Sequence, residues 1–219
     1  MDERKPAFAD IYLCSLAEAE KLPAGFCREH FPKRTERAER YRLSEDRLRA
    51  VGVGAILSAI GIPEENIAYT GSGKPYDVTG RVRFSITHSA EYAAAAVGET
   101  EIGVDLERRS PDHIRVAKRM MTEAEQAYTE GDPLFRFFAL WTLKESVSKL
   151  TGEGLSCGFS GLDVLPLTEG KSILLGEKRI CAATETFGEY TVSVATENTA
   201  LAIRLHFLTA ADLTGEKMR

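Results

Sequence analysis

The sequence predicts an α+β fold made of two halves of similar size, residues 1–102 and 103–219. The composition, 43% hydrophobic and 28% charged over 219 residues, is typical of a globular chain that can bury a sizeable core. Segments with the period of a strand alternate with segments with the period of a helix along the chain. A strand pair that begins at Tyr92 is echoed, at an offset of 98 residues, by one that begins at Tyr190. The echo favours two related halves.

Charge and cysteine usage argue against several classes of protein. The net charge of -5 and the pI near 5.5 argue against a general nucleic-acid binder, which usually has a basic excess. The cysteines show no C-x-x-C spacing, so neither a zinc site nor a disulfide framework is predicted: Cys14, Cys27, Cys157 and Cys181. The charged N-terminus lacks the apolar segment of a signal peptide, and the apolar run Val51–Ile62 is too short to span a bilayer. We expect a cytoplasmic protein without a membrane or nucleic-acid partner.

A predicted strand, Phe8–Leu16, opens the first half, and a polar helix follows it and ends before Pro23. The next segment, Arg28 to Arg49, is dense in arginine and glutamate. Most of its charges fit a solvated helix face with i,i+4 ion pairs.

Three of these arginines fit a second interpretation. Arg34 and Arg37 share one helix face, and Arg49 opens the next helix. Their guanidinium groups could therefore converge on a single anion. The sequence leaves both interpretations open.

A glycine-rich turn, Gly71–Pro75, follows a short predicted strand, Ile67–Tyr69. It is not a P-loop, because Ala68 stands where the first glycine is needed and Pro75 where a serine or threonine would hold magnesium. The turn either presents Lys74 to a ligand or is a plain surface turn.

The segment Val82–Ser89 alternates as a strand, with Phe84 inward and with Ser85 and Thr87 outward. His88 follows at the strand end between two hydroxyl groups. Polar groups at strand ends often bind ligands, so this histidine is either part of an anion site or structural.

The strand around Gly103–Glu107 carries two carboxylates. Asp105 and Glu107 point to one face because side chains alternate along a strand, and the apolar residues between them point into a core. Two like charges held side by side are relieved by a divalent cation such as Mg²⁺, whereas the alternative is a charged, solvated strand face. We expect this strand to form a hairpin with Tyr92–Val97. The equivalents of the carboxylates in the echo are Ile203 and Leu205, which favours an enclosed position.

The second half holds the strongest predicted helix, Leu134–Leu150, which is capped by Asp132 and ends near Gly152. It lies after a basic helix and after a capping box at Thr122. Trp141, Glu145 and Lys149 are spaced by four and share one stripe of the long helix. Glu145 and Lys149 either form a favourable i,i+4 surface ion pair or belong to a site. Short strands up to Leu208 and a polar tail complete the chain.

Four ordered motifs together resemble the Sfp-type 4'-phosphopantetheinyl transferases, which move phosphopantetheine from coenzyme A to a serine of a carrier protein. The motifs are Gly71-Ser72-Gly73-Lys74-Pro75, Phe84-Ser85-Ile86-Thr87-His88-Ser89, Gly103-Val104-Asp105-Leu106-Glu107 and Trp141-Thr142-Leu143-Lys144-Glu145-Ser146 with Lys149. The resemblance runs from Arg34 to Leu155 and, more loosely, over the whole chain. It implies two α+β halves related by a pseudo-twofold axis and release of 3',5'-ADP.

The resemblance also implies roles for individual residues. The implied magnesium ligands are Asp105, Glu107 and Glu145. The implied catalytic groups are Glu145 as general base, Lys149 at the pyrophosphate and His88. The implied contacts to coenzyme A are Arg34, Arg37, Arg49 and His88 at the 3'-phosphate, Lys74 and Pro75 at the adenine, and Thr87 and Lys149. Ser85 stands where the family usually has asparagine, and Thr87 where it usually has serine. Thr87 keeps the hydroxyl group, whereas Ser85 cannot make the bidentate contact of an amide.

The implied partners are coenzyme A and an apo acyl or peptidyl carrier protein, served by a monomer. We expect Arg115, Lys118 and Arg119 of the basic helix to help dock an acidic carrier. Two other hypotheses are a non-catalytic coenzyme A or nucleotide-binding module, motivated by Ser85, and a nucleic-acid binder that uses Arg28 to Arg49. The acidic pI argues against the nucleic-acid binder.

Overall fold

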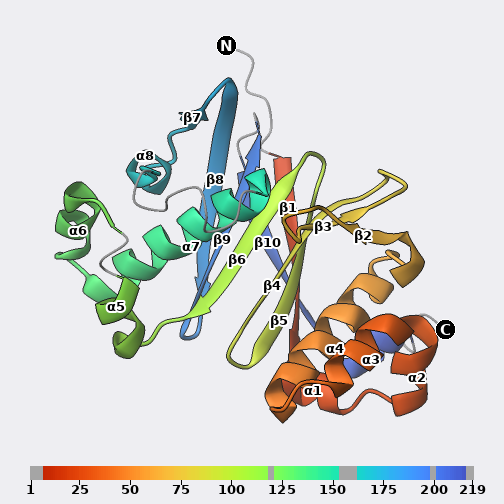
Figure 1. Cartoon of the computed structure of the whole chain (residues 1–219). Coiled ribbons are helices and arrows are strands. Elements are labelled where there is room, and N and C mark those ends of the chain that lie inside the picture. The colour runs from red at the N-terminus through yellow and green to blue at the C-terminus, as the bar shows by residue number, and fades with distance from the viewer. Residues whose placement is uncertain (1–6, 118–120, 153–161, 198–200, 216–219) are drawn as a thin grey trace.

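The computed structural model describes residues 7–117, 121–152, 162–197 and 201–215 (Figure 1). Two four-stranded sheets, each packed against a long helix, form the body of these residues. The predicted α+β class is therefore confirmed. None of the helices in the described part of the chain is both long and apolar enough to cross a membrane.

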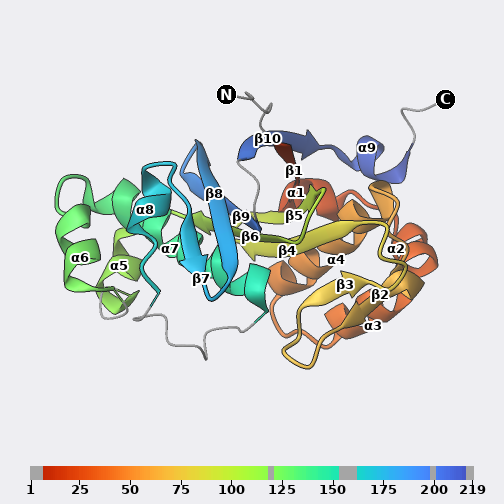
Figure 2. The ribbon, with the colours of Figure 1, turned by 90° about the horizontal axis from the view of Figure 1, so that it is seen from above.

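The first sheet has the strand order β10-β1-β5-β4. Its strands are β1 (Ala7–Ser15), β4 (Arg83–Ser89), β5 (Tyr92–Gly98) and β10 (Leu201–Leu208). Strands β4 and β5 form an antiparallel hairpin, whereas β10 pairs in parallel with β1. Figure 2 shows β10 running alongside β1 toward the last helix of the described residues.

Helices cover one face of the first sheet. The long one is α4 (Ser44–Ala59), joined by α1 (Leu16–Glu20), α2 (Ala24–His30), α3 (Pro32–Glu39) and α9 (Ala210–Thr214). Cys14, Ile56 and Phe84 belong to the buried core between helices and sheet. The segment after α4 continues through η1 (Glu64–Asn66), β2 (Ile67–Tyr69) and β3 (Pro75–Asp77), and β2 and β3 pair as a small separate sheet.

The second sheet has the order β6-β9-β8-β7 and is antiparallel throughout. Its strands are β6 (Ile102–Arg108), β7 (Ile173–Leu175), β8 (Lys178–Phe187) and β9 (Tyr190–Glu197). Helix α7 (Pro133–Thr151) packs across one face, with α5 (Pro111–Ala117), α6 (Glu123–Thr129) and α8 (Leu165–Thr168) nearby. Phe137, Val147 and Ile180 belong to the core under α7.

The faces that the two sheets turn away from their helices share a third core. Ile11 and Leu13 of β1 belong to it together with Val104 and Leu106 of β6 and Val192 of β9, and all five are at most 1% exposed. The apolar residues of β6 therefore point into a core, as predicted. The opposite face of β6, which carries Asp105, turns toward α7.

Strands β4 and β6 belong to different sheets but lie against each other, and side-chain hydroxyl groups connect them. Ser85 Oγ accepts from the backbone N–H of Val104 at 3.2 Å, Thr87 Oγ1 donates to Asp105 Oδ1 at 3.1 Å, and Ser89 Oγ donates to Glu107 Oε2 at 2.8 Å. Ser85 and Thr87 were predicted to face outward, but they do not face solvent. Strand β6 covers them, and they are 4% and 5% exposed.

The predicted hairpin between Tyr92–Val97 and the carboxylate strand is also wrong. Strand β5 pairs with β1 on one edge and with β4 on the other, so β6 passes to the second sheet and pairs with β9. The echoed pair behaves in the same way, since β10 leaves β9 and pairs with β1. Strands β5 and β9 each form a hairpin with the strand that precedes them, β4 and β8. The division into residues 1–102 and 103–219 stays a prediction.

The predicted helix signals of the second half are confirmed. Thr122 and Glu125 form a reciprocal capping box, the side chain of Asp132 accepts from the N–H of Phe135, and Gly152 ends α7 with a φ of 74°. The predicted polar tail begins with the short helix α9, Ala210–Thr214, which has its own capping box at Thr209. The described cysteines Cys14, Cys27 and Cys181 are free thiols, and Cys157 lies outside the described residues.

Gly103 is the point at which β6 and α7 approach most directly. A Cβ atom there would collide with the carbonyl oxygen of Ser146 and the backbone nitrogen of Leu150. These are backbone atoms of a well-packed helix and cannot turn aside as a flexible side chain would. The absence of a side chain at Gly103 therefore sets the distance between the carboxylate strand and α7.

We predict that Gly103→Ala lowers the free energy of unfolding by about 3 kcal/mol, because the added methyl group overpacks a backbone contact. Urea denaturation followed by circular dichroism measures the loss. Gly25→Ala is the matched control, since nothing lies within 4 Å of a Cβ atom at that helical glycine. Equal stabilities for the two variants would contradict the steric account of Gly103.

Candidate active site

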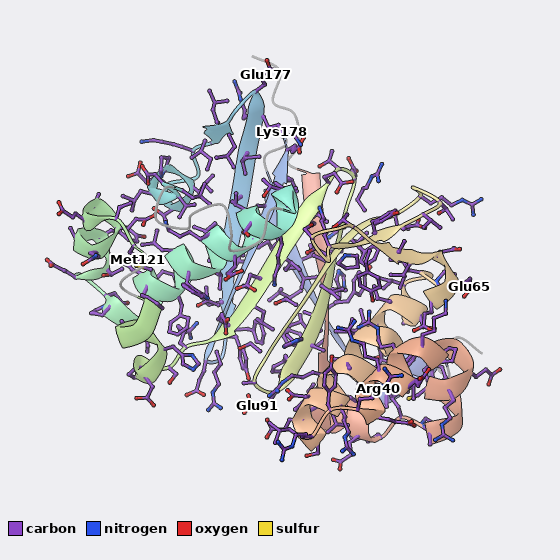
Figure 3. All side chains as sticks on the ribbon, in the orientation of Figure 1. Arg40, Glu65, Glu91, Met121, Glu177 and Lys178 are labelled. Carbon is purple, nitrogen blue, oxygen red and sulfur yellow. The ribbon has the colours of Figure 1, made fainter. Side chains whose placement is uncertain are left out.

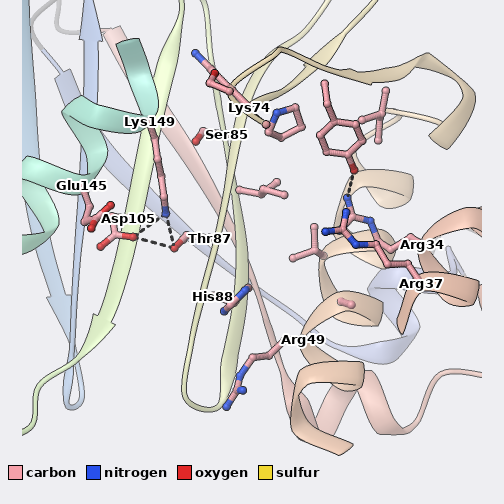
Figure 4. Close-up of a pocket in the computed structure, with 18 of the residues that line it drawn as sticks. Arg34, Arg37, Arg49, Lys74, Ser85, Thr87, His88, Asp105, Glu145 and Lys149 are labelled. Atoms are coloured by element: carbon pink, nitrogen blue, oxygen red, sulfur yellow. Dashed lines mark hydrogen bonds and ion pairs between the residues drawn. The ribbon is translucent and has the colours of Figure 1, made fainter. Parts of the chain in front are cut away.

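A cavity of about 970 Å³ opens between α3, α4 and the β2–β3 segment on one side and β6 and α7 on the other. All of the sequence-predicted site residues line it: Arg34, Arg37, Arg49, Lys74, Pro75, Thr87, His88, Asp105, Glu107, Glu145 and Lys149. The fold thus brings together residues more than a hundred positions apart in the sequence. Figure 4 shows that the carboxylates and the arginines lie at different walls of this pocket.

Asp105 forms the centre of the acidic wall and is 5% exposed. Its Oδ1 accepts from Lys149 Nζ at 2.7 Å and from Thr87 Oγ1 at 3.1 Å (dashed lines in Figure 4). Its Oδ2 is buried and, among the described residues, has no hydrogen-bond partner. A buried carboxylate oxygen without a partner is costly, so this atom is suited to accept a cation or a donor from a ligand.

Glu145 and Glu107 complete a cluster of three coupled carboxylates. Burial raises the pKa of Glu145, the charges of Asp105 and Glu107 add to this effect and Lys149 opposes it, and the resulting pKa is about 7. Burial and Asp105 also raise the pKa of Glu107, against the hydrogen bond from Ser89. The interpretation of β6 as a solvated strand face is therefore wrong for Asp105 and Glu107.

Lys149 is the cation in contact with this cluster. It pairs with Asp105 across the two elements, and in the described part of the chain it makes no ion pair with Glu145, its neighbour one turn back. The alternative of an i,i+4 surface pair is thus not what the structure shows. No three histidine, cysteine, aspartate or glutamate side chains of the described ranges converge closely enough to hold a metal ion.

The basic wall is formed by α3. Arg34 and Arg37 project from it, and Arg34 Nη2 donates to the hydroxyl of Tyr69 at 3.4 Å (Figure 4). Arg37 is exposed and has no ion pair within the described residues. Two guanidinium groups one helical turn apart, with few acidic partners, are suited to bind a phosphate group.

Arg49 lies at another wall, near His88 and away from Arg34 (Figure 4). Its nitrogens are engaged by Asp46 Oδ1 at 2.7 Å, Glu45 Oε2 at 2.9 Å and the carbonyl of Ala90 at 2.9 Å. The three arginines therefore share the cavity, but they do not converge on one point in this conformation. Arg49 holds the turn between β4 and β5, on which Ala90 has a φ of 44°.

His88, the penultimate residue of β4, lies at the same wall of the cavity. Loss of hydration within the pocket lowers the pKa of its imidazole, and the charges of Lys149 and Arg49 lower it further. The ring is therefore neutral at neutral pH. A neutral imidazole can gain a proton, and thus a positive charge, when an anion binds beside it.

Lys74 and Pro75 lie at the rim formed by the β2–β3 turn. Lys74 Nζ donates to Glu101 Oε2 at 3.1 Å and to the carbonyl of Leu150 at 2.9 Å. It therefore joins this turn to the end of α7, while Pro75 begins β3 and lines the cavity. Ser85 also lines the cavity, but its hydroxyl oxygen accepts from Val104.

The sequence prediction missed several residues of the cavity wall, among them Lys33, Tyr41, Glu64 and Tyr69. Lys33 directly precedes Arg34 in the arginine-dense segment, so the sequence alone could have indicated that it belongs to the site. Glu64 and Tyr69 reach α3 from a segment some thirty residues later, and no local pattern indicates such a contact.

Comparison with known proteins agrees with this geometry. The profile of the 4'-phosphopantetheinyl transferase superfamily matches residues 101–203, which include β6 and α7. A 4'-phosphopantetheinyl transferase of Bacillus subtilis is 30% identical over 171 residues, covering 75% of this chain and 73% of its own. The transferase psf-1 of Bacillus pumilus is 29% identical over 202 residues, 84% of this chain and 85% of its own. The transferase gsp of Aneurinibacillus migulanus is 34% identical over 106 residues, 46% and 44% of the two chains.

A nucleotide-sized cavity between an arginine wall and a carboxylate cluster defines an enzyme that acts on a phosphorylated substrate. The chain belongs to the 4'-phosphopantetheinyl transferase family. The predicted family and the predicted activity, transfer of phosphopantetheine to a carrier protein, are confirmed. The hypotheses of a non-catalytic binding module and of a nucleic-acid binder are set aside.

We predict that His88 titrates below 6.5 in the ligand-free protein and that Lys149→Met raises its midpoint, because the mutation removes a neighbouring positive charge. A pH titration of the histidine ring signals by NMR, with His88→Gln for assignment, measures both values. Lys171→Met is the control, since Lys171 pairs with Glu169 at 2.5 Å and does not line the cavity. A midpoint unchanged by Lys149→Met would contradict the electrostatic account.

Proposed function

We propose that the cavity binds coenzyme A with its 3'-phosphate at Arg34 and Arg37 and its pyrophosphate near Lys149. The observation that carries this proposal is the separation of charge within one cavity: a basic wall on α3 and a carboxylate cluster between β6 and α7. A phosphate group fits the first, and a metal-bound pyrophosphate beside an acceptor serine fits the second. The carrier serine would enter from the open side of the acidic wall.

The donor chemistry of the carboxylates suits a magnesium ion, although their side chains do not converge on one point in this conformation, in which Lys149 is paired with Asp105. Asp105 offers a buried oxygen without a partner among the described residues, and burial together with the charge of Asp105 raises the pKa of Glu145 and Glu107. We propose Asp105, Glu107 and Glu145 as its ligands, since hard oxygen donors suit this ion. When bound, Mg²⁺ would neutralise charge on the pyrophosphate and on the departing 3',5'-ADP.

Glu145 is the proposed general base. In the metal-free site the pKa of Glu145 is about 7, and a bound cation would lower it, so Glu145 would be ionised at neutral pH and could accept the proton of the acceptor serine, directly or through one water. The serine oxygen forms a bond to the phosphorus that bears pantetheine, and the bond from that phosphorus to 3',5'-ADP breaks. Lys149 would turn from Asp105 toward the pyrophosphate oxygens and stabilise the charge that develops there.

The remaining predicted contacts keep their proposed roles. Arg49 and His88 lie at a wall away from Arg34, so they would reach the 3'-phosphate only after Arg49 leaves Glu45 and Asp46. Lys74 and Pro75 would border the adenine, and Thr87 would orient Lys149 through the hydrogen bond that Lys149 donates to it at 3.1 Å. We further expect the enzyme to act as a cytoplasmic monomer.

An intact-mass assay tests the donor and the acceptor together. The purified protein is incubated with Mg²⁺, coenzyme A and a panel of apo acyl and peptidyl carrier proteins, and each carrier is weighed. We expect the phosphopantetheine mass on at least one carrier and release of 3',5'-ADP. Failure on every carrier, together with failure to bind coenzyme A, would contradict the proposal.

We predict that Glu145→Gln lowers turnover at least about 100-fold while coenzyme A still binds, because the variant loses a proton acceptor and keeps the shape of the side chain. Single-turnover kinetics and calorimetric titration with coenzyme A measure the two effects. Glu99→Gln, an exposed glutamate outside the cavity, is the control with the same chemical change. Unchanged turnover in Glu145→Gln would exclude the general-base role.

The carrier-docking residues remain a proposal, because the side chain of Arg115 and residues Lys118 and Arg119 lie outside the described residues. We predict that reversing these three charges to glutamate raises the KM for an acidic carrier and leaves the affinity for coenzyme A unchanged. Steady-state kinetics with each substrate varied in turn separates the two. A rise in both constants would count against a docking role.

A further inference from the structure

Helix α3, which carries Arg34 and Arg37, has no capping side chain at its own N-cap. The cap position is held by Phe31, whose ring is 2% exposed and fills the space above Gly54, where a Cβ atom would lie 2.5 Å from it. Pro32 occupies the first helical position and has no N–H group. The first-turn N–H groups that need an acceptor are therefore those of Lys33 and Arg34.

Both N–H groups are satisfied by one carboxylate from another segment. Glu64 Oε2 accepts from Lys33 N at 2.7 Å, and Glu64 Oε1 accepts from Arg34 N at 2.7 Å. Glu64 begins η1, thirty residues further along the chain. The same segment continues to Tyr69, whose hydroxyl accepts from the guanidinium group of Arg34. The start of α3 is thus attached to the η1–β2 segment through backbone and side chain alike.

We propose that Glu64 is a positioning residue for the donor site: its carboxylate fixes the start of α3 and thereby directs Arg34 and Arg37 toward the 3'-phosphate of coenzyme A. This inference rests on the proposed function of those arginines. A short, basic helix has little stability of its own, so its first turn depends on the acceptor that caps it. Glu64 lines the same cavity, but its oxygens are occupied by backbone donors of α3.

The negative charge of Glu64 would act on coenzyme A binding in the opposite direction to its role as a helix cap. A carboxylate beside a phosphate site repels the ligand, so its removal would tighten binding if charge were the main effect. Glu64→Gln removes the charge and keeps one acceptor oxygen, whereas Glu64→Ala removes the charge and both acceptors. Comparing the two variants isolates the contribution of the cap.

The experiment measures binding and turnover with coenzyme A and with 3'-dephospho-coenzyme A, which lacks the phosphate group that Arg34 and Arg37 would hold. We expect Glu64→Ala to weaken coenzyme A about tenfold, in line with the loss of a helix cap, and to leave kcat and the KM for the carrier unchanged. Glu64→Gln should lie between Glu64→Ala and the unchanged protein. Binding of 3'-dephospho-coenzyme A should be the same in all three proteins.

Two further variants make the outcomes distinct. Glu65→Ala is the matched control, since Glu65 is an exposed neighbour at the outer edge of the molecule (Figure 3) and should bind coenzyme A normally. Arg34→Ala with Arg37→Ala should abolish the preference for coenzyme A over the dephosphorylated form. If this double variant keeps the preference, the proposed phosphate site is wrong. The positioning role of Glu64 is wrong if the double variant loses the preference for coenzyme A while Glu64→Ala keeps normal affinity. It is also wrong if both Glu64 variants bind coenzyme A more tightly.

Discussion

The contact between β6 and α7 at Gly103 determines the geometry of the acidic site. Asp105 lies two residues along the strand from this contact, and Glu145 and Lys149 lie on the facing turns of the helix. With the backbones held this close, the ammonium of Lys149 reaches Asp105 at 2.7 Å. The glycine therefore also matters for the electrostatics of the site. A wider gap between β6 and α7 would move Asp105 away from Lys149, whose positive charge offsets that of the carboxylates.

The two walls of the cavity differ in how their charged side chains are paired. On the acidic wall, three carboxylates share one lysine, and burial together with the neighbouring negative charges raises the pKa of Glu145 to about 7. On the basic wall, Arg37 has no ion pair in the described ranges, while Arg49 is held by Glu45 and Asp46. A donor with a phosphate at one end and a metal-bound pyrophosphate at the other would supply the missing opposite charge at both walls.

Local periodicity was sufficient to predict that Asp105 and Glu107 share a face, and the spacing of four placed Glu145 and Lys149 on one stripe of α7. The same period-two rule gave the wrong surroundings for Ser85 and Thr87, because it cannot show that an edge strand of a second sheet covers them. The hairpin between β5 and β6 failed for a related reason: a turn signal does not reveal that β1 already occupies the edge of β5. The capping of α3 by Glu64 depends on tertiary contact alone.

The parallel pairing of β1 with β10 has a consequence for how the chain folds. Asp10 on β1 forms an ion pair with Arg204 and a hydrogen bond with His206 on β10, so these contacts span nearly the whole sequence. During synthesis the β1 edge of the first sheet has no partner until residues 201–208 have emerged from the ribosome. Contacts of such high sequence separation fold slowly and leave an open strand edge in the meantime. The first half therefore completes its sheet only after the second half, and with it the catalytic helix, has been made.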